Sequence, residues 1–446
     1  MDEVFRLLVF FRDDNFNRYG GHITMSGQTI RSLDLHQVYS IRGYPAIEAV
    51  VVTENGAVGR AVCAAGVSVG THEIPFKYDG GTRFKGRGTK QAAAFGKEVL
   101  SPLLLGENAA CQQNIDRIML EAGKHIVGGN VTAAVSAAVL KAGAASLGIP
   151  LYQHIGGARA VTLPVPGTLL CFVQRLYNEG PPTNKPTYSY LAYDFPTFEE
   201  ASYALWVCLS AFEKKVYKRW GLVSGFMPGM FAIPMGCIQS DEEIWQLATE
   251  VIVECGYENK VGIQVDVGSD TYYDHKTGIY EGLFCPGKRD RDEQIDFLCE
   301  MVKKYPFVCL EDPLFEDDFE GTAILTRKTD IQIVGDDLFT TNSQRVKEGA
   351  AVGAANCVLL KVNQIGTISE ALDMIQTAYD HGYGIMPCMS RGEGIEICDY
   401  AVGINAGTIR ESGLGEYGNR FIEIERELGS RARFAGKQGL MGKRFR

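Results

Sequence analysis

The sequence has little of what marks a secreted protein held together by disulfides. Its twelve cysteines include no C-x-x-C pair and no clustered spacing, and several lie inside apolar runs, as Cys208, Cys309 and Cys357 do. A free cysteine in such a run behaves as a small apolar residue. The distribution therefore argues against a disulfide framework and favours a reducing compartment, and we expect a cytoplasmic protein.

Long apolar runs and an excess of positive charge are also missing. No apolar stretch approaches the roughly 20 residues of a membrane span, and RLLVFF near the N-terminus is too short for the apolar core of a signal peptide. The formal net charge of -10 argues against a general nucleic-acid binder. One basic stretch remains, Arg431 to Arg446, and a solvated tail is preferred there over a contact with an anionic partner.

The length and the residue patterns predict two domains in 446 residues. Residues 29–80 alternate as strands do, with a hairpin signal at ENGA, and residues 89–147 are alanine-rich and helical in pattern. From about residue 240 strands and helices alternate, which predicts an α/β barrel after a smaller α+β domain. The expected divisions are an N-terminal extension (1–28), the α+β domain (29–160), the barrel (161–436) and a basic C-terminal tail (437–446).

Four short segments of the C-terminal half each carry a charged residue where a strand is expected to end. VGIQVDV, FVCLEDP and IQIVGDD supply Asp266, Glu311 and Asp336, and VLLKVNQ supplies Lys361. The carboxyl ends of barrel strands converge on one site, and oxygen-only ligands suit Mg2+ better than zinc. We therefore expect a magnesium site. Lys361 fits two roles about equally, a general base and an ion-pair partner of the acids.

Several motifs together resemble those of the enolase family, the 2-phosphoglycerate hydro-lyases, from about residue 29 to 436. SIRGYPAIEAVVVTENG resembles DSRGNPTVEVEVTTxxG, and AGVSVGTHE resembles the family's mobile loop GASTGxxE. LEDPLFEDDF, IQIVGDDL and LLKVNQIGTISEA resemble SIEDPFAEDDW, QIVADDL and LLKVNQIGTLSES, while GTIRESG and RFAGK stand where the family has GxIKTG and RYAG. The resemblance implies an enolase-like modified (β/α)8 barrel preceded by a smaller α+β lid domain, a homodimer and a Mg2+ site.

The resemblance also implies roles for single residues. The three strand-end carboxylates become the metal ligands and Lys361 the base. Ser68, between the two glycines of AGVSVGTHE, becomes the loop serine that reaches the metal when the loop closes; from the sequence alone, a mobile lid and an ordinary hairpin turn fit this loop equally well. Arg410 stands where the family has a lysine that holds the substrate carboxylate, so the charge is kept, but a planar fork replaces a point charge.

The parts of the family site that release hydroxide and hold phosphate are replaced. With the downstream IQ as the anchor, the glutamate of GDEGGFAP falls on Phe231. SHRSGET has become CMSRGEG, so the histidine becomes Met389 and the phosphate-binding arginine becomes Ser390. A shift of one residue in the alignment would place Arg391 at the arginine position but would not restore the histidine, so Ser390 and Arg391 are both candidate substrate-binding residues. Loss of a general acid or base typically costs about 10²–10⁴-fold in rate.

Two further motifs are lost. The histidine of GGSHAG has no counterpart, because no histidine lies between His154 and His275, and QEFMIAPTG is replaced by SYLAYDFPT. The favoured interpretation is a pseudoenzyme, an enolase fold with little dehydratase activity and a binding or structural role. The alternatives are a Mg2+-dependent enzyme that acts on another carboxylate, with Lys361 as base and Asp194 or Glu393 as replacement groups, and an active enolase.

A binding role would use segments that the family motifs do not cover. These are the N-terminal extension, the loop at 177–190 with its PPTNKP insertion, and the basic tail, all as contact surfaces for other proteins. An association with the cytoskeleton would fit a retained scaffold with added termini, although no motif specifies it. We expect a homodimer, and neither a nucleic acid nor a membrane as a partner.

Overall fold

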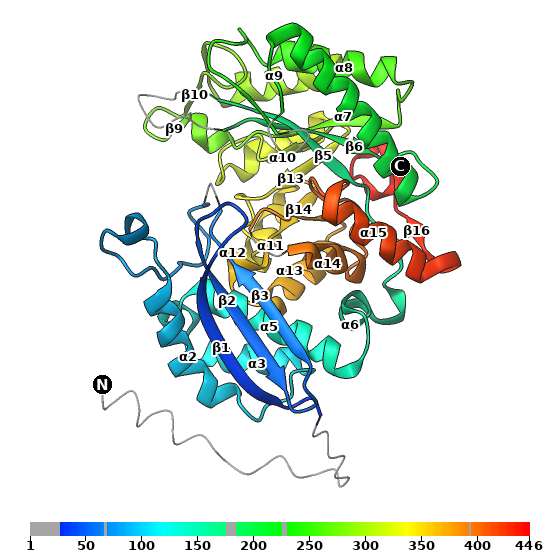
Figure 1. The fold of residues 1–446 in the computed structure, drawn as a ribbon. Helices are drawn as coiled ribbons and strands as arrows, with labels where there is room; N and C mark the ends of the chain where they lie inside the picture. Colours follow the sequence, from blue (N-terminus) through cyan, green and yellow to red (C-terminus); the bar gives the residue numbers. More distant parts are fainter. Residues whose placement is uncertain (1–26, 67–68, 175–183, 225–229, 392–393) are drawn as a thin grey trace.

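The computed structural model describes residues 27–66, 69–174, 184–224, 230–391 and 394–446. It confirms the expected fold class, since a small α+β part precedes a larger α/β barrel (Figure 1). In the first part β1 (Ile30–Tyr39), β2 (Pro45–Thr53) and β3 (Val58–Cys63) form an antiparallel sheet in that order. The predicted hairpin at ENGA joins β2 to β3. The helices of this first domain are α2 (Lys90–Leu104), α3 (Gln112–Glu121), α4 (Lys124–Val127), α5 (Gly129–Leu147) and α6 (Leu151–Gly156).

Helix α5 is the centre of this first domain. It is apolar on all sides, as a helix covered on all sides should be. By length and composition it is the one helix within the described ranges that could cross a membrane, yet 72% of the apolar window is buried inside the protein. Strand β3 crosses it at Gly59, where a Cβ atom would lie 1.9 Å from the carbonyl oxygen of Ala138. Only glycine permits this close approach of strand and helix.

The barrel strands follow one another around a ring. Their order is β15 (Gly384–Pro387), β14 (Cys357–Leu360), β13 (Gln332–Gly335), β12 (Phe307–Glu311), β8 (Val261–Asp266), β6 (Thr187–Ala192) and β5 (Gly167–Val173), with the short β7 (Phe231–Ile233) paired to β5. The segment around Thr408 closes the ring, because Thr408 bridges to Val165 and Arg410 bridges to Cys388. Strand β6 runs antiparallel to both of its neighbours, β5 and β8.

Helices cover the outside of the barrel. They are α7 (Phe198–Trp220), α8 (Glu242–Glu254), α9 (Arg291–Lys304), α10 (Phe319–Lys328), α11 (Ser343–Val352), α12 (Val362–Ile365), α13 (Ile368–Asp380), α14 (Ile397–Gly403) and α15 (Gly415–Leu428). Short strands lie outside the ring: β4 (Thr162–Leu163) pairs with β16 (Arg433–Phe434), and β9 (Tyr273–Asp274), β10 (Ile279–Glu281) and β11 (Lys288–Arg289) form a small sheet.

The C-terminal residues 437–446 pack on the barrel, so the prediction of a solvated tail is wrong. Leu440 is fully buried, and the Phe445 ring lies 5.4 Å from the Tyr193 ring, centroid to centroid. Arg444 donates hydrogen bonds to the Asp330 carboxylate (2.7 Å) and to the carbonyl of Phe307 (2.8 Å). Because these two residues precede β13 and begin β12, the tail caps the amino-terminal ends of barrel strands.

Asp194, a predicted replacement group, lies at this same end. Its carboxylate pairs with Lys437 of the tail at 2.8 Å and is about two-fifths exposed. The cause is the direction of β6: this strand runs opposite to its neighbours, so the residues after it emerge at the end of the barrel away from the strand-end acids. Asp194 therefore belongs to the contact between the tail and the barrel and not to the site.

Candidate active site

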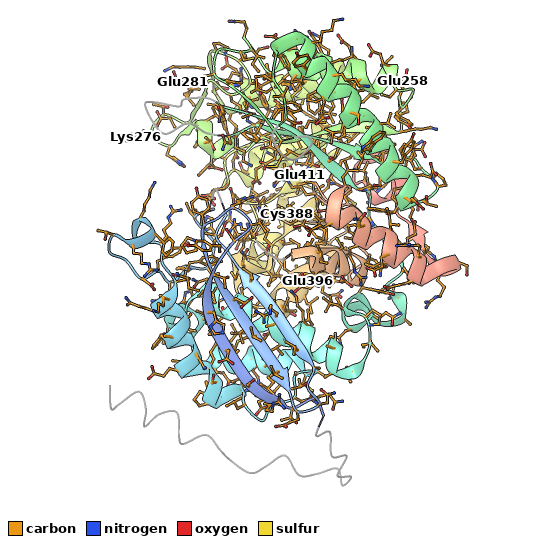
Figure 2. All side chains as sticks on the ribbon, viewed as in Figure 1. Glu258, Lys276, Glu281, Cys388, Glu396 and Glu411 are labelled. Atoms are coloured by element: carbon orange, nitrogen blue, oxygen red, sulfur yellow. The ribbon has the colours of Figure 1, made fainter. Side chains whose placement is uncertain are left out.

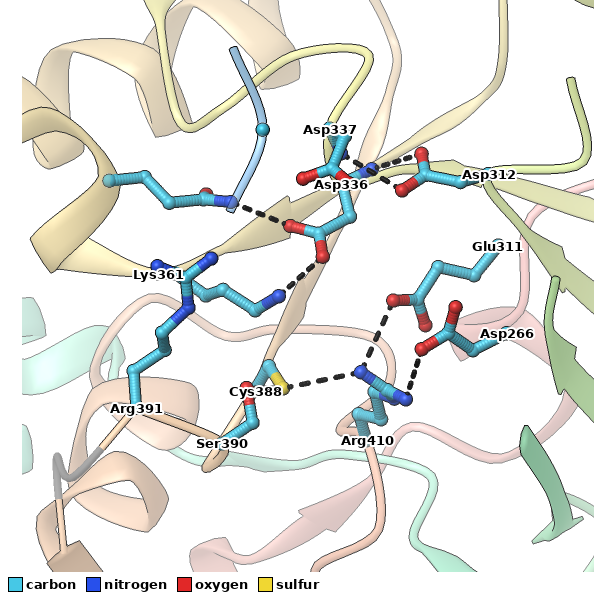
Figure 3. Close-up of polar contacts among 12 residues, drawn as sticks. Asp266, Glu311, Asp312, Asp336, Asp337, Lys361, Cys388, Ser390, Arg391 and Arg410 are labelled. Atoms are coloured by element: carbon cyan, nitrogen blue, oxygen red, sulfur yellow. Dashed lines mark hydrogen bonds and ion pairs between the residues drawn. The ribbon is translucent and has the colours of Figure 1, made fainter. Parts of the chain in front are cut away.

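The three predicted ligands and Lys361 lie together at the carboxyl ends of the barrel strands (Figure 3). Asp266 is the last residue of β8, Glu311 the last of β12, and Asp336 and Lys361 directly follow β13 and β14. All four side chains are buried. The strand-plus-helix spacing of the sequence thus correctly predicted that these charges lie at one end of the barrel.

Lys361 and Asp336 form a buried ion pair. The Lys361 ammonium donates to Asp336 Oδ2, and Gln364 Nε2 donates to Asp336 Oδ1 at 2.8 Å. Burial alone would lower the pKa of Lys361, but the Asp336 carboxylate outweighs burial and raises that pKa above its usual value. A general base needs the uncharged amine. Of the two roles that the sequence left open, this arrangement favours the ion-pair partner.

Asp266 and Glu311 share the guanidinium of Arg410 (Figure 3). Arg410 Nη2 donates to Asp266 Oδ2, and Arg410 Nη1 lies 3.2 Å from Glu311 Oε1. Asp266 also accepts a hydrogen bond from the Lys185 ammonium. Burial would raise the pKa of Asp266, but Lys185 and Arg410 together lower it to about 2. At Glu311 burial outweighs Arg410 and raises the pKa to about 8.

Lys185 and Glu411 also belong to the site, although the sequence motifs did not predict them. Lys185 lies in the PPTNKP insertion, which was interpreted as part of a contact loop; residues 187–190 of that loop form part of β6, and 177–183 lie outside the described residues. Glu411 follows Arg410 in GTIRESG, and its Oε1 lies 3.4 Å from Arg410 Nη2. Figure 2 places Glu411 and Cys388 towards the middle of the molecule, while Lys276 and Glu281 lie at its rim. For Glu411, the signal in the sequence was a charged residue at a position where the family motif GxIKTG has an uncharged threonine.

A cavity of about 160 Å³ opens beside the ion pairs. Residues 69–71, Gly268, Thr271, His275 and Lys185 contribute to its lining. Its acidic lining residues are Asp266, Asp270, Asp312, Glu316, Asp336 and Asp337. Burial and mutual repulsion raise the pKa of Asp270 to about 7 and that of Asp337 to about 8. The cavity is therefore rich in carboxyl groups, several of which resist ionisation.

Three groups within the described ranges bring ligand atoms within 4.8 Å of one another. They are His72, Glu316 and Asp317; Asp270, Glu316 and Asp337; and Asp312, Asp336 and Asp337. The set predicted from the sequence, Asp266, Glu311 and Asp336, is not one of them. Acidic clusters that could bind a metal are thus present, but the described side chains of the predicted set do not converge to that distance.

Arg391 is bound to the segment that resembles the mobile loop. Its guanidinium forms two hydrogen bonds with the Glu73 carboxylate, one of 2.6 Å, and each of the two side chains is 2% exposed. The neighbouring Thr71 N–H donates to Glu316 Oε2 at 3.2 Å, and His72 Nε2 lies 2.8 Å from Asp317 Oδ1. The loop residues 69–74 are therefore fastened to the barrel at several points. Ser68 lies outside the described residues.

The replaced positions carry no compensating acid or base. Phe231 begins β7, is 2% exposed, and packs its ring against Phe212 in the main core. Met389 packs against the same core, and Ser390 Oγ accepts a hydrogen bond from the Cys388 thiol at 3.2 Å. Glu393, the second suggested replacement group, lies outside the described residues.

Comparison with known proteins gives two matches to family models. The model "Enolase, N-terminal domain" matches residues 30–155, and the model "Enolase, C-terminal TIM barrel domain" matches residues 211–442. Among curated proteins the chain is 35% identical to the enolase of Methanocaldococcus jannaschii over 423 residues, which is 92% of this chain and 97% of the relative. It is 36% identical to the enolase of Thermococcus gammatolerans over 427 residues, with the same shares of the two chains.

Proposed function

This chain belongs to the enolase family, and from that premise we propose that it is a pseudoenzyme: an enolase fold with little or no 2-phosphoglycerate dehydratase activity that serves as a binding or structural subunit. The observation that carries the proposal is the charge balance of the candidate active site. Each strand-end carboxylate faces a cation of the protein itself. The carboxylates are Asp266, Glu311 and Asp336, and the cations are Lys185, Arg410 and Lys361.

The site does not fit a resident Mg2+ at these carboxylates. Their oxygen-only chemistry suits the ion, and if bound it would stabilise negative charge on a substrate. However, the oxygens that would coordinate it already accept hydrogen bonds from ammonium and guanidinium groups. A divalent ion would have to displace these cations or share buried oxygens with them. We therefore derive no reaction step through a metal.

The leaving-group half of the reaction lacks its acid in every alignment. No aspartate or glutamate lies between Glu213 and Asp241, the stretch in which the family's GDEGGFAP would fall. By the family resemblance, that glutamate is the residue that assists the departure of hydroxide. Since no shift of the alignment restores a carboxyl group there, the loss does not depend on whether Phe231 is the matching position.

The residues around the cavity also disfavour the binding of a phosphate group. The family's phosphate-binding arginine has Ser390 at its position, and the adjacent Arg391 is occupied by Glu73. A phosphate group entering the cavity would meet mainly carboxyl side chains. Placing like charges together in a partly buried site is unfavourable, so a doubly charged phosphate ester is a poor ligand for this cavity.

The binding role that we propose falls on the surfaces that the family does not share. The C-terminal tail is packed on the barrel, which leaves the N-terminal extension and residues 177–183 as the candidate contact segments; residues 1–26 of the extension and residues 177–183 lie outside the described ranges. A homodimer, a cytoplasmic location and a cytoskeletal partner remain parts of this proposal that pull-down and size measurements on the full chain would test.

The deciding experiment is a coupled assay of 2-phosphoglycerate dehydration. The purified full chain with Mg2+ is compared with an archaeal relative such as the Methanocaldococcus jannaschii enolase at equal concentration. We expect a rate at least about 10⁴-fold below the relative, because a general acid and phosphate contacts are both absent. A Lys361→Met variant is the control for contaminating enzyme, since contamination would survive the substitution. Turnover within about 100-fold of the relative, abolished by Lys361→Met, would refute the proposal and support an active enolase.

A further inference from the structure

We infer that Lys185 is a built-in cation that takes the place of the family's divalent metal ion at Asp266. The proposed function says that catalysis is lost; this inference goes further and names the side chain that closes the metal position. The geometry points to it because the Lys185 ammonium donates directly to Asp266 Oδ2, the last residue of β8. Mg2+ bound at this oxygen would have to share it with the Lys185 ammonium, and the two positive charges would repel each other at close range.

The backbone places Lys185 opposite its partner. Thr187 at the start of β6 pairs in register with Asp266 at the end of β8. Because β6 is antiparallel to β8, the residues just before β6 emerge at the carboxyl end of β8, where the acids lie. Lys185, two residues before Thr187, therefore lies at the same end of the barrel as Asp266, and its ammonium reaches the Asp266 carboxylate.

Two further contacts hold Lys185 in this position. The Tyr272 hydroxyl donates a hydrogen bond to the Lys185 carbonyl, and Tyr272 is 1% exposed. The Lys185 side chain lies over Gly268, where a Cβ atom would be 2.9 Å from Lys185 Cδ. Gly268 also has φ +52°, a conformation that favours glycine. The cation is thus seated by its backbone, its aliphatic chain and its charged end, unlike a solvated surface lysine.

The family motifs account for the positive charge of Arg410 but not for that of Lys185. By the family resemblance, Arg410 has a cationic counterpart, a lysine, in enzymes that bind Mg2+. Lys185 instead comes from the PPTNKP segment, which the family motifs do not contain. On this inference, the Lys185 ammonium is therefore the group that blocks the metal position at Asp266.

Binding of Mn2+ without substrate tests the inference. The ion is followed by electron paramagnetic resonance and by titration calorimetry on the full-length chain, its Lys185→Met variant and its Lys185→Arg variant. Methionine keeps the length and apolar body of the side chain and removes the charge, whereas arginine keeps the charge. We expect no stoichiometric binding in the natural chain or in Lys185→Arg, and an affinity gain of at least about 100-fold in Lys185→Met. Adding Asp266→Asn to Lys185→Met should abolish that gain.

The outcomes separate this inference from the proposed function. Stoichiometric Mn2+ binding by the natural chain that Asp266→Asn removes would overturn the inference, whether or not 2-phosphoglycerate is turned over. Absence of binding in both the natural chain and a folded Lys185→Met variant would also overturn it, because some other group would then close the position. If Lys185→Met fails to fold, Lys185→Gln, which also removes the charge and keeps a polar end group, takes its place in the same comparison. Metal binding without turnover would refute the built-in cation and leave the pseudoenzyme proposal standing.

Discussion

Removal of the Glu73 carboxylate should free the loop that resembles the family's mobile loop. Glu73 binds Arg391 through two hydrogen bonds, both side chains are 2% exposed, and Glu73 Oε1 also accepts a hydrogen bond from the Gly70 N–H at 3.1 Å. The carboxylate raises the pKa of Arg391 against the effect of burial, which would lower it. Glu73→Gln would remove the carboxylate charge that is hydrogen-bonded to this buried guanidinium.

The cost of this change is large for one side chain. Breaking a buried ion pair by removal of one partner costs about 3–5 kcal/mol. If that energy holds residues 69–74 on the barrel, their opening equilibrium should rise by about 10²–10⁴-fold, since 1.36 kcal/mol corresponds to a factor of ten. Amide hydrogen exchange of a locally opening segment follows this equilibrium.

The measurement is hydrogen–deuterium exchange, read on peptides that cover residues 69–74 in the full chain. The matched control is His72→Ala in the same loop, because the His72 and Asp317 side chains are 37% and 44% exposed and such a pair is worth about 1 kcal/mol or less. We expect exchange in this segment to accelerate by two orders of magnitude or more in Glu73→Gln and less than about tenfold in the control. Equal, small effects of the two substitutions would show that the buried pair does not hold the loop, and the reasoning would be wrong.

Two further predictions concern the pH dependence and the tail. Burial and repulsion from Glu316 raise the pKa of Asp270 to about 7 in the folded protein, so ionisation of Asp270 should lower stability as pH rises from about 4 to about 7 and have no further effect above that. The urea midpoint should therefore fall less between pH 5 and pH 8 in Asp270→Asn than in the natural chain. An identical fall in both proteins would contradict the raised pKa of Asp270. Phe445→Ala should lower the free energy of unfolding in urea by about 3–5 kcal/mol. Arg446→Ala, at an exposed position, should change it by no more than about 0.5 kcal/mol. A similar small loss in both variants would mean that the tail does not stabilise the barrel.

Local sequence patterns predicted several strands, a hairpin and a helix start. Alternation predicted the strands of the first domain, and the ENGA hairpin joins β2 to β3. Thr367 begins the sequence TISE, which has the S/T-x-x-E order typical of a helix start. It caps α13, and Thr367 Oγ1 accepts a hydrogen bond from the Glu370 N–H at 3.3 Å. These features depend on residues within one or two turns of each other, which is the range that a sequence pattern covers.

The partners of the charges could not be predicted in this way. Lys185 meets Asp266 across 81 positions, and Glu73 meets Arg391 across 318. The reversed direction of β6 decides that Lys185 reaches the acids while Asp194 faces the other end of the barrel. No period or spacing in the sequence encodes that reversal, although the lysine of PPTNKP was the available signal.

On our proposal, the charge balance explains how the acidic motifs can persist without a metal. A buried carboxylate is costly unless a cation or hydrogen-bond donors compensate it. In a family member that holds Mg2+, the ion adds to that compensation; here the Lys185 ammonium adds to it, beside Arg410 and Lys361, which both stand at cationic positions of the family. On our proposal the carboxylates now serve the fold, because removal of one would leave a buried cation unpaired at a cost comparable to that of Glu73→Gln. Strand-end acids in a sequence of this family are therefore a sign of a charged barrel interior, and the cations beside them decide whether a metal has room to bind.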